Sequence, residues 1–563
     1  MNTAPRRMRL SLLSFAFLLA VLSLPAAAPA QDAAAVRAMD EMLSKAYPPN
    51  EPGAAVIVVK DGKTVLRKGY GMADMELGVK VEPDMVFRLG SVTKQFTSAA
   101  ILMLAERGKL SVTDDITKFL PDYPTKGRAI TVEHLLTHTS GIKSYTTLPA
   151  WRALWRRDMT VAEMIELFKN EPMDFAPGEQ WLYNNSGYTL LGAIIEKVSG
   201  QTYEEFVRGN IFEPLGMTHS FYGSTARVIP RRVPGYTRDR GGVIQNAEYL
   251  SMTQPYAAGS LLSNVDDLAL WDAALYTEKV VKQDSLRRAF TPYVLKDGTP
   301  VTYGYGWGLV QYEGHPIAAH SGGIHGFGTM VVRLPEDHAY IAVLTNRDYA
   351  VPDNVAMQLA AILVGKPIRT AVAVQVAPAD LDALVGVYQI NERETFNVRR
   401  EGARLLIQRN KGRQAEVFPL SPTDFFYEPD GPDRLTFTKD AAGKVTGLKV
   451  TRVFGMGASA VRTDKPLPQE RAVANLAAEA LERYVGVYRL TASSSITVSL
   501  RGEQLYAQTT GGPESELFPA SEKLFNWKGV DAQLEFRTGA DGKVAGLIVW
   551  GSRLRAGVGV KVR

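Results

Sequence analysis

The sequence predicts a mixed α/β (α+β) domain, in which helices flank an antiparallel sheet, followed by two small antiparallel β-barrel domains. Strand-like runs occur at both ends of residues 33–369 with helical periodicity between them, a pattern typical of a sheet closed by both ends of one region. The remaining residues contain two copies of one pattern, about 100 residues apart. We therefore expect domains at residues 31–373, 374–464 and 465–563, after a signal peptide at residues 1–30.

Two pairs of apolar, β-branched runs mark the expected sheet. Ala54–Val59 and Thr64–Gly69 flank Asp61-Gly62, a dipeptide typical of tight hairpins. Thr329–Leu334 and Tyr340–Thr345 form the second pair, at the other end of the region. Hydrogen bonding between a strand of the first pair and a strand of the second would join both ends of the region in one sheet.

The C-terminal repeat has matching motifs throughout its length. Leu384–Tyr388 recurs as Tyr484–Tyr488, and Gly443–Leu448 recurs as Gly542–Leu547. The offset exceeds the roughly 20–50 residues of solenoid repeats, so each copy is expected to be a whole domain. Short alternating runs with Gly, Asp and Pro turns predict antiparallel barrels. Linkers are expected at Val374–Asp380 and at residues 464–478, the second becoming helical in pattern.

The first thirty residues are typical of a secretory signal peptide. Arg6, Arg7 and Arg9 precede the apolar run Leu10–Leu24, and Ala28-Pro29-Ala30 fits the small-residue cleavage pattern. The run is shorter than the ~20 residues that a spanning helix needs. We expect cleavage after Ala30, a secreted or periplasmic product and no stable membrane insertion. An uncleaved membrane anchor is the alternative.

Charge and cysteine content exclude several function classes. Removal of the signal peptide, which holds three arginines and no acid, lowers the formal net charge from +5 to +2. A nucleic-acid partner is therefore not expected. The chain has no cysteine, which excludes disulfides, thiolate metal sites and a cysteine nucleophile.

The first of three short motifs is Ser91-Val92-Thr93-Lys94, at the start of a helix predicted over Val92–Arg107. A spacing of three residues puts the serine and the lysine on one helix face, one turn apart. A serine hydroxyl becomes a good nucleophile when a neighbouring base takes its proton, and a lysine serves as that base when burial lowers its pKa. The pattern is weak alone, because a surface helix with an N-cap serine also produces it.

The second motif is Tyr183-Asn184-Asn185, in a polar loop before the apolar helix expected at Thr189–Val198. A tyrosine hydroxyl beside a lysine can carry a proton to a leaving group, and the Asn185 amide can hold a substrate carbonyl. Turn and N-cap chemistry is the alternative, and it is the role expected of Asn184.

The third motif is His320-Ser321-Gly322-Gly323, which is expected to precede a strand. Glycines there allow a substrate backbone to lie alongside, and the Gly323 N–H can face a developing oxyanion. His320 adds a group that titrates near neutrality. A bulge at the entry to a strand is the alternative. Together the three motifs predict a serine acyl-transfer site.

His134 and His138 have the spacing of a pair of metal ligands. No glutamate stands at the metalloprotease position between them and no third ligand is evident, so we expect a structural role and no metal site.

With these motifs in this order, residues 50–350 resemble the penicillin-recognising serine hydrolases. That family includes class C β-lactamases, D-alanyl-D-alanine carboxypeptidases, esterases and D-aminopeptidases. Its Ser-Asp-Asn and Lys-Thr-Gly elements are replaced here by Tyr183-Asn184-Asn185 and His320-Ser321-Gly322. His134–Ile142 and Ala258–Ser263 also look like family signatures. The resemblance implies a β-lactamase/transpeptidase-like fold, an acyl-enzyme on Ser91, proton transfer by Lys94 and Tyr183, and no metal or organic cofactor.

Two departures refine the resemblance. β-Lactamases of this branch normally carry lysine where this chain carries His320, whereas its peptidases more often carry histidine. A catalytic domain followed by two barrels is similar to the D-stereospecific aminopeptidases, in which a loop of the last barrel reaches into the active site. The matching loop, Gln508–Leu517, carries Glu514 and Glu516, which would bind a substrate's ammonium group.

The resemblance thus favours hydrolysis of amide bonds in D-amino-acid-containing peptides. β-Lactamase, D,D-carboxypeptidase (penicillin-binding protein) and carboxylesterase activities are alternatives, and so is a non-catalytic cell-wall or partner-binding protein. The expected partner is a small peptide, β-lactam or ester substrate, and the sequence does not decide the oligomeric state.

Overall fold

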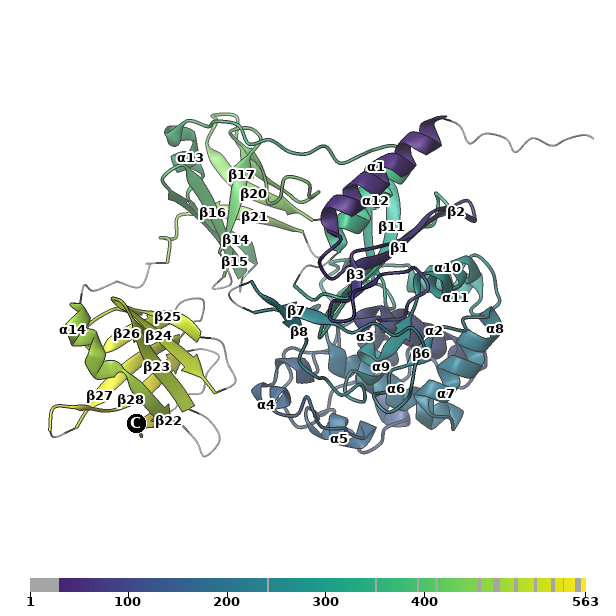
Figure 1. Cartoon of the computed structure of the whole chain (residues 1–563), viewed down its shortest axis with the longest axis horizontal. Coiled ribbons are helices and arrows are strands. Elements are labelled where there is room, and N and C mark those ends of the chain that lie inside the picture. Colours follow the sequence, from purple (N-terminus) through teal and green to yellow (C-terminus); the bar gives the residue numbers. More distant parts are fainter. Residues whose placement is uncertain are drawn as a thin grey trace, which may run out of the picture.

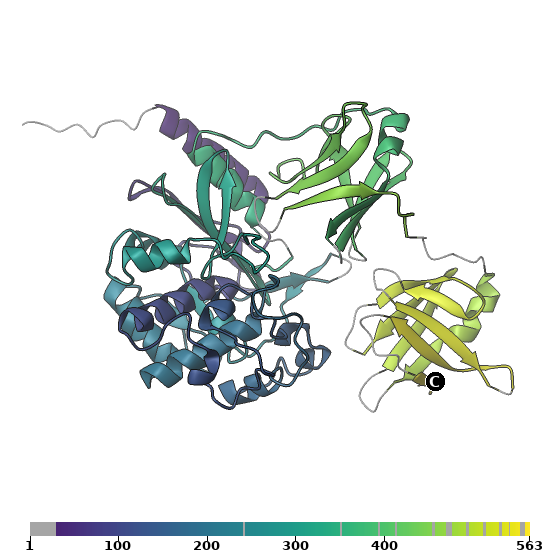
Figure 2. The ribbon, with the colours of Figure 1, turned by 180° about the vertical axis from the view of Figure 1, so that it is seen from behind.

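The computed structural model describes residues 30–239, 242–349, 352–391, 394–410, 414–452, 457–468, 476–490, 495–510, 514–527, 532–539, 541–551 and 558–562. A large mixed domain is followed by two closed antiparallel barrels, drawn in green and yellow in Figures 1 and 2. This architecture confirms the predicted fold class. Residues 1–29 of the expected signal peptide lie outside the described residues.

The large domain is built on a six-stranded antiparallel sheet in the order β10-β11-β12-β13-β1-β2. Its strands are β1 (Ala54–Lys60), β2 (Lys63–Tyr70), β10 (Gly308–Tyr312), β11 (His315–Ile324), β12 (Phe327–Leu334) and β13 (Ala339–Thr345). β1 pairs with β13 from Ala54 opposite Thr345 to Lys60 opposite Ala339. The two ends of the region therefore close one sheet, as predicted.

Side chains of β1 alternate between two cores because successive residues of a strand point to opposite faces. Val56 and Val58 pack with helices α1 (Ala30–Ala46) and α12 (Asp353–Leu363) on one face. Ala55 and Ile57 belong to the larger core on the other face. Burial on both faces explains why β1 reads as a continuous apolar run.

The helices between the strands lie on the second face of the sheet (Figure 1). They are α2 (Thr93–Glu106), α3 (Val132–Leu136), α4 (Pro149–Arg152), α5 (Val161–Glu166), α6 (Asn185–Ser199), α7 (Tyr203–Val207), α8 (Glu213–Leu215), α9 (Tyr256–Gly259), α10 (Val265–Ala274) and α11 (Gln283–Ala289). α2 confirms the helix predicted over Val92–Arg107, but it is buried on all sides from Thr93 to Leu104 rather than on one face. None of the helices in the described part of the chain has the length and apolarity needed to span a bilayer.

Short strands connect the sheet to the helices. They are β3 (Met72–Asp74), β4 (Val79–Lys80), β5 (Phe87–Arg88), β6 (Phe221–Tyr222), β7 (Tyr236–Arg238), β8 (Ile244–Asn246) and β9 (Leu261–Ser263). β5, β9 and β6 form a small sheet. β5 leads directly into the 3-10 turn η1 (Gly90–Val92), which precedes α2.

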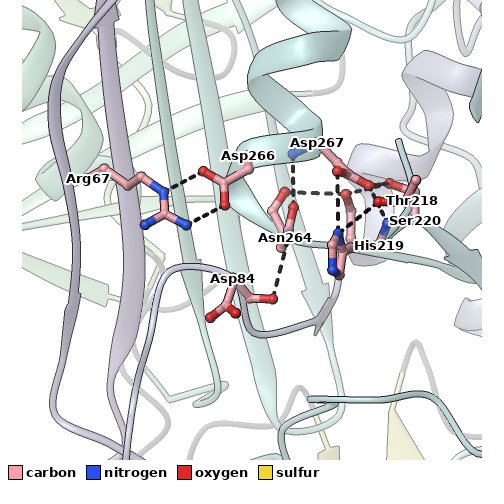
Figure 3. A network of polar contacts seen from close by, with 9 residues as sticks. Arg67, Asp84, Thr218, His219, Ser220, Asn264, Asp266 and Asp267 are labelled. Atoms are coloured by element: carbon pink, nitrogen blue, oxygen red, sulfur yellow. Dashed lines mark hydrogen bonds and ion pairs between the residues drawn. The ribbon is translucent and has the colours of Figure 1, made fainter. Parts of the chain in front are cut away.

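A polar network at the start of α10 ties the edge strand β2 to the helical side (Figure 3). Arg67 of β2 donates two hydrogen bonds of 2.6 Å to Asp266. Asp267 accepts hydrogen bonds of 2.8 Å from the backbone of His219 and from the Ser220 hydroxyl. Asn264 caps the helix by accepting from the Asp267 N–H. The network holds segments that are far apart in sequence.

The two barrels have the same strand order, as the repeat predicted. The first contains β14 (Gly386–Asn391), β15 (Glu394–Glu401), β16 (Arg404–Arg409), β17 (Gln414–Pro419), β18 (Asp424–Phe426), β19 (Arg434–Lys439), β20 (Val445–Thr451) and β21 (Ala458–Thr463). The second contains β22 (Gly486–Arg489), β23 (Ser495–Arg501), β24 (Gln504–Thr509), β25 (Glu514–Pro519), β26 (Leu524–Trp527), β27 (Ala532–Thr538), β28 (Val544–Gly551) and β29 (Val558–Lys561).

Equivalent tyrosines fix the entry to each barrel. Tyr388 donates a hydrogen bond of 2.6 Å to the Leu384 carbonyl, and Tyr488 donates one of 2.7 Å to the Tyr484 carbonyl. The helices α13 (Pro378–Leu384) and α14 (Ala478–Leu481) lead into the barrels. α13 begins inside the stretch predicted as the first linker, and residues 469–475 of the second linker lie outside the described residues.

Candidate active site

Ser91 lies where the chain turns from strand β5 into helix α2. Gly90 has a φ of +52°, which a glycine adopts without steric cost. The Leu89 N–H donates to the Leu261 carbonyl at 2.9 Å, so the residues before Ser91 are held by the β9 segment. This local geometry leaves the Ser91 side chain half-buried at the N-terminal end of a buried helix.

The Lys94 amine has three neighbours that define its chemistry. It donates to the Asn185 Oδ1 at 2.9 Å and to the Ala258 carbonyl at 2.8 Å, and its Nζ lies 3.2 Å from the Ser91 Oγ. A neutral amine has two N–H bonds and one lone pair. Because the two carbonyl oxygens take both N–H bonds, the lone pair is left for the Ser91 hydroxyl. Lys94 is thus placed as the base that takes the serine proton.

Burial favours the neutral form of Lys94, which this role needs. Its side chain is fully buried, and desolvation lowers its pKa well below the usual value. The rings of Tyr183 and Tyr188 have their centroids 4.8 and 5.2 Å from the Nζ atom. No carboxylate of the described residues forms an ion pair with Lys94 that would restore its charge.

Tyr183 lies against both Lys94 and His320, with its ring 6.2 Å from the His320 ring. Its buried hydroxyl makes no hydrogen bond of normal geometry within the described part of the chain. Burial raises the pKa of Tyr183, and the nearby Ser91 hydroxyl opposes the rise. Tyr183 is therefore a protonated phenol beside the nucleophile, able to pass a proton to a leaving group.

Asn185 is the first residue of helix α6, so the prediction that it lies in a loop before a helix starting at Thr189 is wrong. The helix begins earlier because Asn184 caps it, accepting from the Gly187 N–H at 2.8 Å. The Asn185 side chain bonds to Lys94 through its oxygen and to Thr146 through its nitrogen, at 3.3 Å. Helix geometry, rather than a flexible loop, fixes its position.

The His320–Gly323 motif precedes strand β12, as predicted, and itself lies within strand β11. β10 pairs with β11 only as far as Gly308 opposite Ala319, whereas β12 pairs with it as far as Ile324. From His320 onward, β10 therefore does not pair with the edge of β11 that faces away from β12, as strand-like substrate binding would require. The edge is unpaired because β10 ends early, and substrate binding along it stays a prediction.

The glycines of β11 allow it to approach Ser91 closely. A Cβ on Gly90 would lie 3.1 Å from the Gly323 N, so this N–H is adjacent to the turn that carries Ser91. A Cβ on Gly322 would overlap the Leu89 carbonyl oxygen. This close approach is what the predicted oxyanion hole of the Ser91 and Gly323 N–H groups requires.

His320 is a neutral imidazole with both nitrogens in use. Its Nδ1 donates to the Ser321 carbonyl at 2.6 Å, so its Nε2 accepts from the Tyr303 hydroxyl at 2.8 Å. Burial lowers the pKa of His320 to about 3. The expectation that this histidine titrates near neutrality is therefore wrong.

Two residues behind the site were not assigned to it from the sequence. The ring of His138 lies 4.4 Å from that of Tyr183 and 4.7 Å from that of Tyr303. Its Nδ1 accepts from the Asn184 N–H at 3.1 Å, and burial lowers its pKa well below the usual value. Tyr303 lies in a glycine-rich segment whose pattern gives no signal of this role.

His134, which has metal-ligand spacing from His138 in the sequence, has a structural function. His134 accepts from the Thr131 N–H at 3.1 Å and completes the N-terminal cap of α3. Within the described residues, no group of three or more His, Cys, Asp or Glu side chains is arranged to hold a metal ion.

Glu514 and Glu516 lie on β25 of the second barrel. Glu514 accepts from Ser499 at 3.0 Å and pairs with Arg501 at 2.8 Å, both within the same barrel. The tip of the predicted loop, residues 511–513, lies outside the described residues. The structure brings Ser91, Lys94, Tyr183, Asn185 and His320–Gly323 together, and their contact with Glu514 or Glu516 stays a prediction.

This fold and this site define a serine acyl-transfer enzyme. The Beta-lactamase family matches residues 40–366, and the chain belongs to that family. It is a serine hydrolase with a penicillin-binding protein or β-lactamase fold. A second match, to a domain of unknown function (DUF3471), covers residues 470–554, which span most of the second barrel.

Named relatives agree with this assignment. The chain is 30% identical to penicillin-binding protein 4* of Bacillus subtilis over 69% of its own length and 90% of that protein. An octameric penicillin-binding protein homologue from Pyrococcus abyssi is 27% identical, with a TM-score of 0.54 over 76% of this chain and 99% of that one. A D-stereospecific amidohydrolase from Streptomyces sp. is 26% identical, with a TM-score of 0.50 over 58% and 98%.

Proposed function

We propose that the chain is a D-aminopeptidase-like hydrolase, which cleaves amide bonds of small D-amino-acid-containing peptides through an acyl-enzyme on Ser91. The observation that carries the proposal is the burial of His320 between the Tyr303 hydroxyl and the Ser321 carbonyl, which favours its neutral form. A substrate with a carboxylate next to its leaving group, such as a β-lactam or a D,D-dipeptide acid, binds more tightly when a cation lies at this end of the site. His320 supplies none, so amides with an uncharged leaving side are favoured. The likeness to a D-stereospecific amidohydrolase supports the stereochemistry.

The proposed reaction has two steps. Lys94 accepts the Ser91 proton as the oxygen attacks the carbonyl carbon, and the N–H groups of Ser91 and Gly323 hold the oxyanion. Tyr183 donates its proton to the leaving amine and regains one from Lys94. Water then attacks the acyl ester, with the same groups moving its proton in the reverse direction.

Release of p-nitroaniline from D-alanine p-nitroanilide tests the proposal, with the L-enantiomer and Ser91→Ala as controls. We expect turnover of the D form, at least tenfold preference over the L form, and loss of nearly all activity in Ser91→Ala. Hydrolysis of nitrocefin, a β-lactam, and of the dipeptide D-alanyl-D-alanine is measured in parallel. Faster turnover of either of these than of the anilide would replace the proposal with a β-lactamase or carboxypeptidase.

We also propose that the protein is exported and cut after Ala30. The basic and apolar pattern of residues 1–30 supports this. The intact mass of protein purified from a secreting host is expected to equal that of a chain starting at Gln31. A mass equal to that of the full chain from Met1 would contradict the proposal.

A further inference from the structure

A row of four ring side chains runs from the start of helix α6, which carries Asn185, to the end of strand β11, which carries Gly323. The ring of Tyr145 lies 5.3 Å from that of Trp151, Trp151 lies 5.6 Å from Trp155, and Trp155 lies 4.3 Å from His325. The row begins beside Asn185, because the Tyr145 N–H donates to the Ser186 hydroxyl at 2.8 Å. It ends at His325, two residues beyond Gly323.

Neighbouring contacts hold the last two rings in place. The Trp155 carbonyl accepts from the Ser251 N–H at 2.8 Å, and the His325 Nδ1 lies 3.2 Å from the Glu248 carbonyl oxygen. The Arg152 guanidinium lies 5.1 Å from the Trp155 ring centre. The indole Nε1 of Trp155 is buried and has no hydrogen-bond partner among the described residues. A buried donor of this kind is costly unless a ligand or water accepts from it.

The row lies at a defined end of the proposed substrate. Tyr183, the donor to the leaving group, packs against His320 at the start of the open edge of β11. Gly323, the proposed oxyanion donor, lies three residues further along. With these proposed roles, the leaving group would extend toward His320, and the acyl group would extend past Gly323 toward His325.

We propose that Trp155 and His325 close the acyl end of the site and limit the acyl group to one amino-acid residue. The enzyme would then release single residues from the amino end of its substrate. This inference rests on the proposed function and deepens it, because it sets the length of the acyl group.

The test compares D-alanine p-nitroanilide with glycyl-D-alanine p-nitroanilide, which differs by one added residue at the amino end. We expect the wild-type kcat/KM to favour the shorter anilide by at least 100-fold. Trp155→Ala and His325→Ala should reduce that ratio below tenfold by raising kcat/KM for the longer substrate. Trp155→Phe keeps a ring and should retain most of the preference.

Trp550→Ala is the matched control, since Trp550 is a half-exposed indole of the second barrel that bonds to Glu535. It should leave the ratio unchanged. p-Nitrophenyl esters of the same two acyl groups read the length preference independently of amide hydrolysis. If the anilides are inert but the esters show the predicted ratios, the proposed function fails and the length limit stands. Equal wild-type rates on both acyl lengths, or unchanged ratios in Trp155→Ala and His325→Ala, would overturn the inference.

Discussion

Replacing Gly322 by alanine tests whether the close approach of strand β11 positions Ser91. The added Cβ would lie under 3.0 Å from both the Leu89 carbonyl oxygen and the Thr329 hydroxyl. The Cβ would lie 2.0 Å from the Leu89 oxygen and ordinary contacts begin near 3.4 Å, so β11 and Leu89 must separate by more than 1 Å. Overpacking of this kind costs about 1–3 kcal/mol of stability. Leu89 precedes Ser91 by two residues, and a displacement of about 1 Å at a reacting group costs about 10²-fold in rate.

The assay is kcat/KM for the best substrate found, together with the melting temperature of the catalytic domain. Gly323→Ala is the control on the next residue, because its Cβ would meet no heavy atom within 4 Å and its N–H is kept. We expect Gly322→Ala to lose about 10²-fold in kcat/KM and several degrees in melting temperature, and Gly323→Ala to lose less than tenfold. A Gly322→Ala enzyme with normal melting and activity within threefold of wild type would refute the reasoning.

Three further predictions concern buried titratable groups. Lys94→Met should lower the acylation rate constant, measured by stopped flow, by about 10²–10⁴-fold while the fold persists, because the base is lost. An unchanged acylation rate constant would remove Lys94 from the mechanism. The pKa of His320 is lowered to about 3, so between pH 6.5 and pH 3 the unfolded state binds the proton and the folded state does not, and stability decreases as the pH is lowered. Denaturant melts of His320→Asn should show a smaller decrease over this range. An equal decrease in both proteins would contradict the assigned charge state. Asp272→Ala should cost about 3–5 kcal/mol because it strands Arg333, which donates to Asp272 at 2.6 Å inside the core. Asp266→Ala, at a more exposed ion pair, should cost about 0–1 kcal/mol in the same urea titrations, and similar losses in both would argue against burial as the cause.

The sequence predicted the components of the site better than their surroundings. Ser91 and Lys94 were identified because a three-residue spacing on a helix is a local property. The start of α6 was misplaced by four residues, since the Asn184 cap competes with the apolar periodicity that marks Thr189 onward. The role of Tyr303 was missed because its hydrogen bond to His320 depends on a contact that no local pattern encodes.

The amino-acid sequence by itself determined the fold class, the order of the three motifs and the duplication of the barrels, since these depend on periodicity and spacing along the chain. Tertiary structure decided the chemistry of the site. Lys94 and His320 are neutral because packing removes water from around them, and desolvation is a property of all the elements that enclose a group. The open edge of β11 likewise exists because β10 ends opposite Ala319, a pairing limit that only the assembled sheet defines.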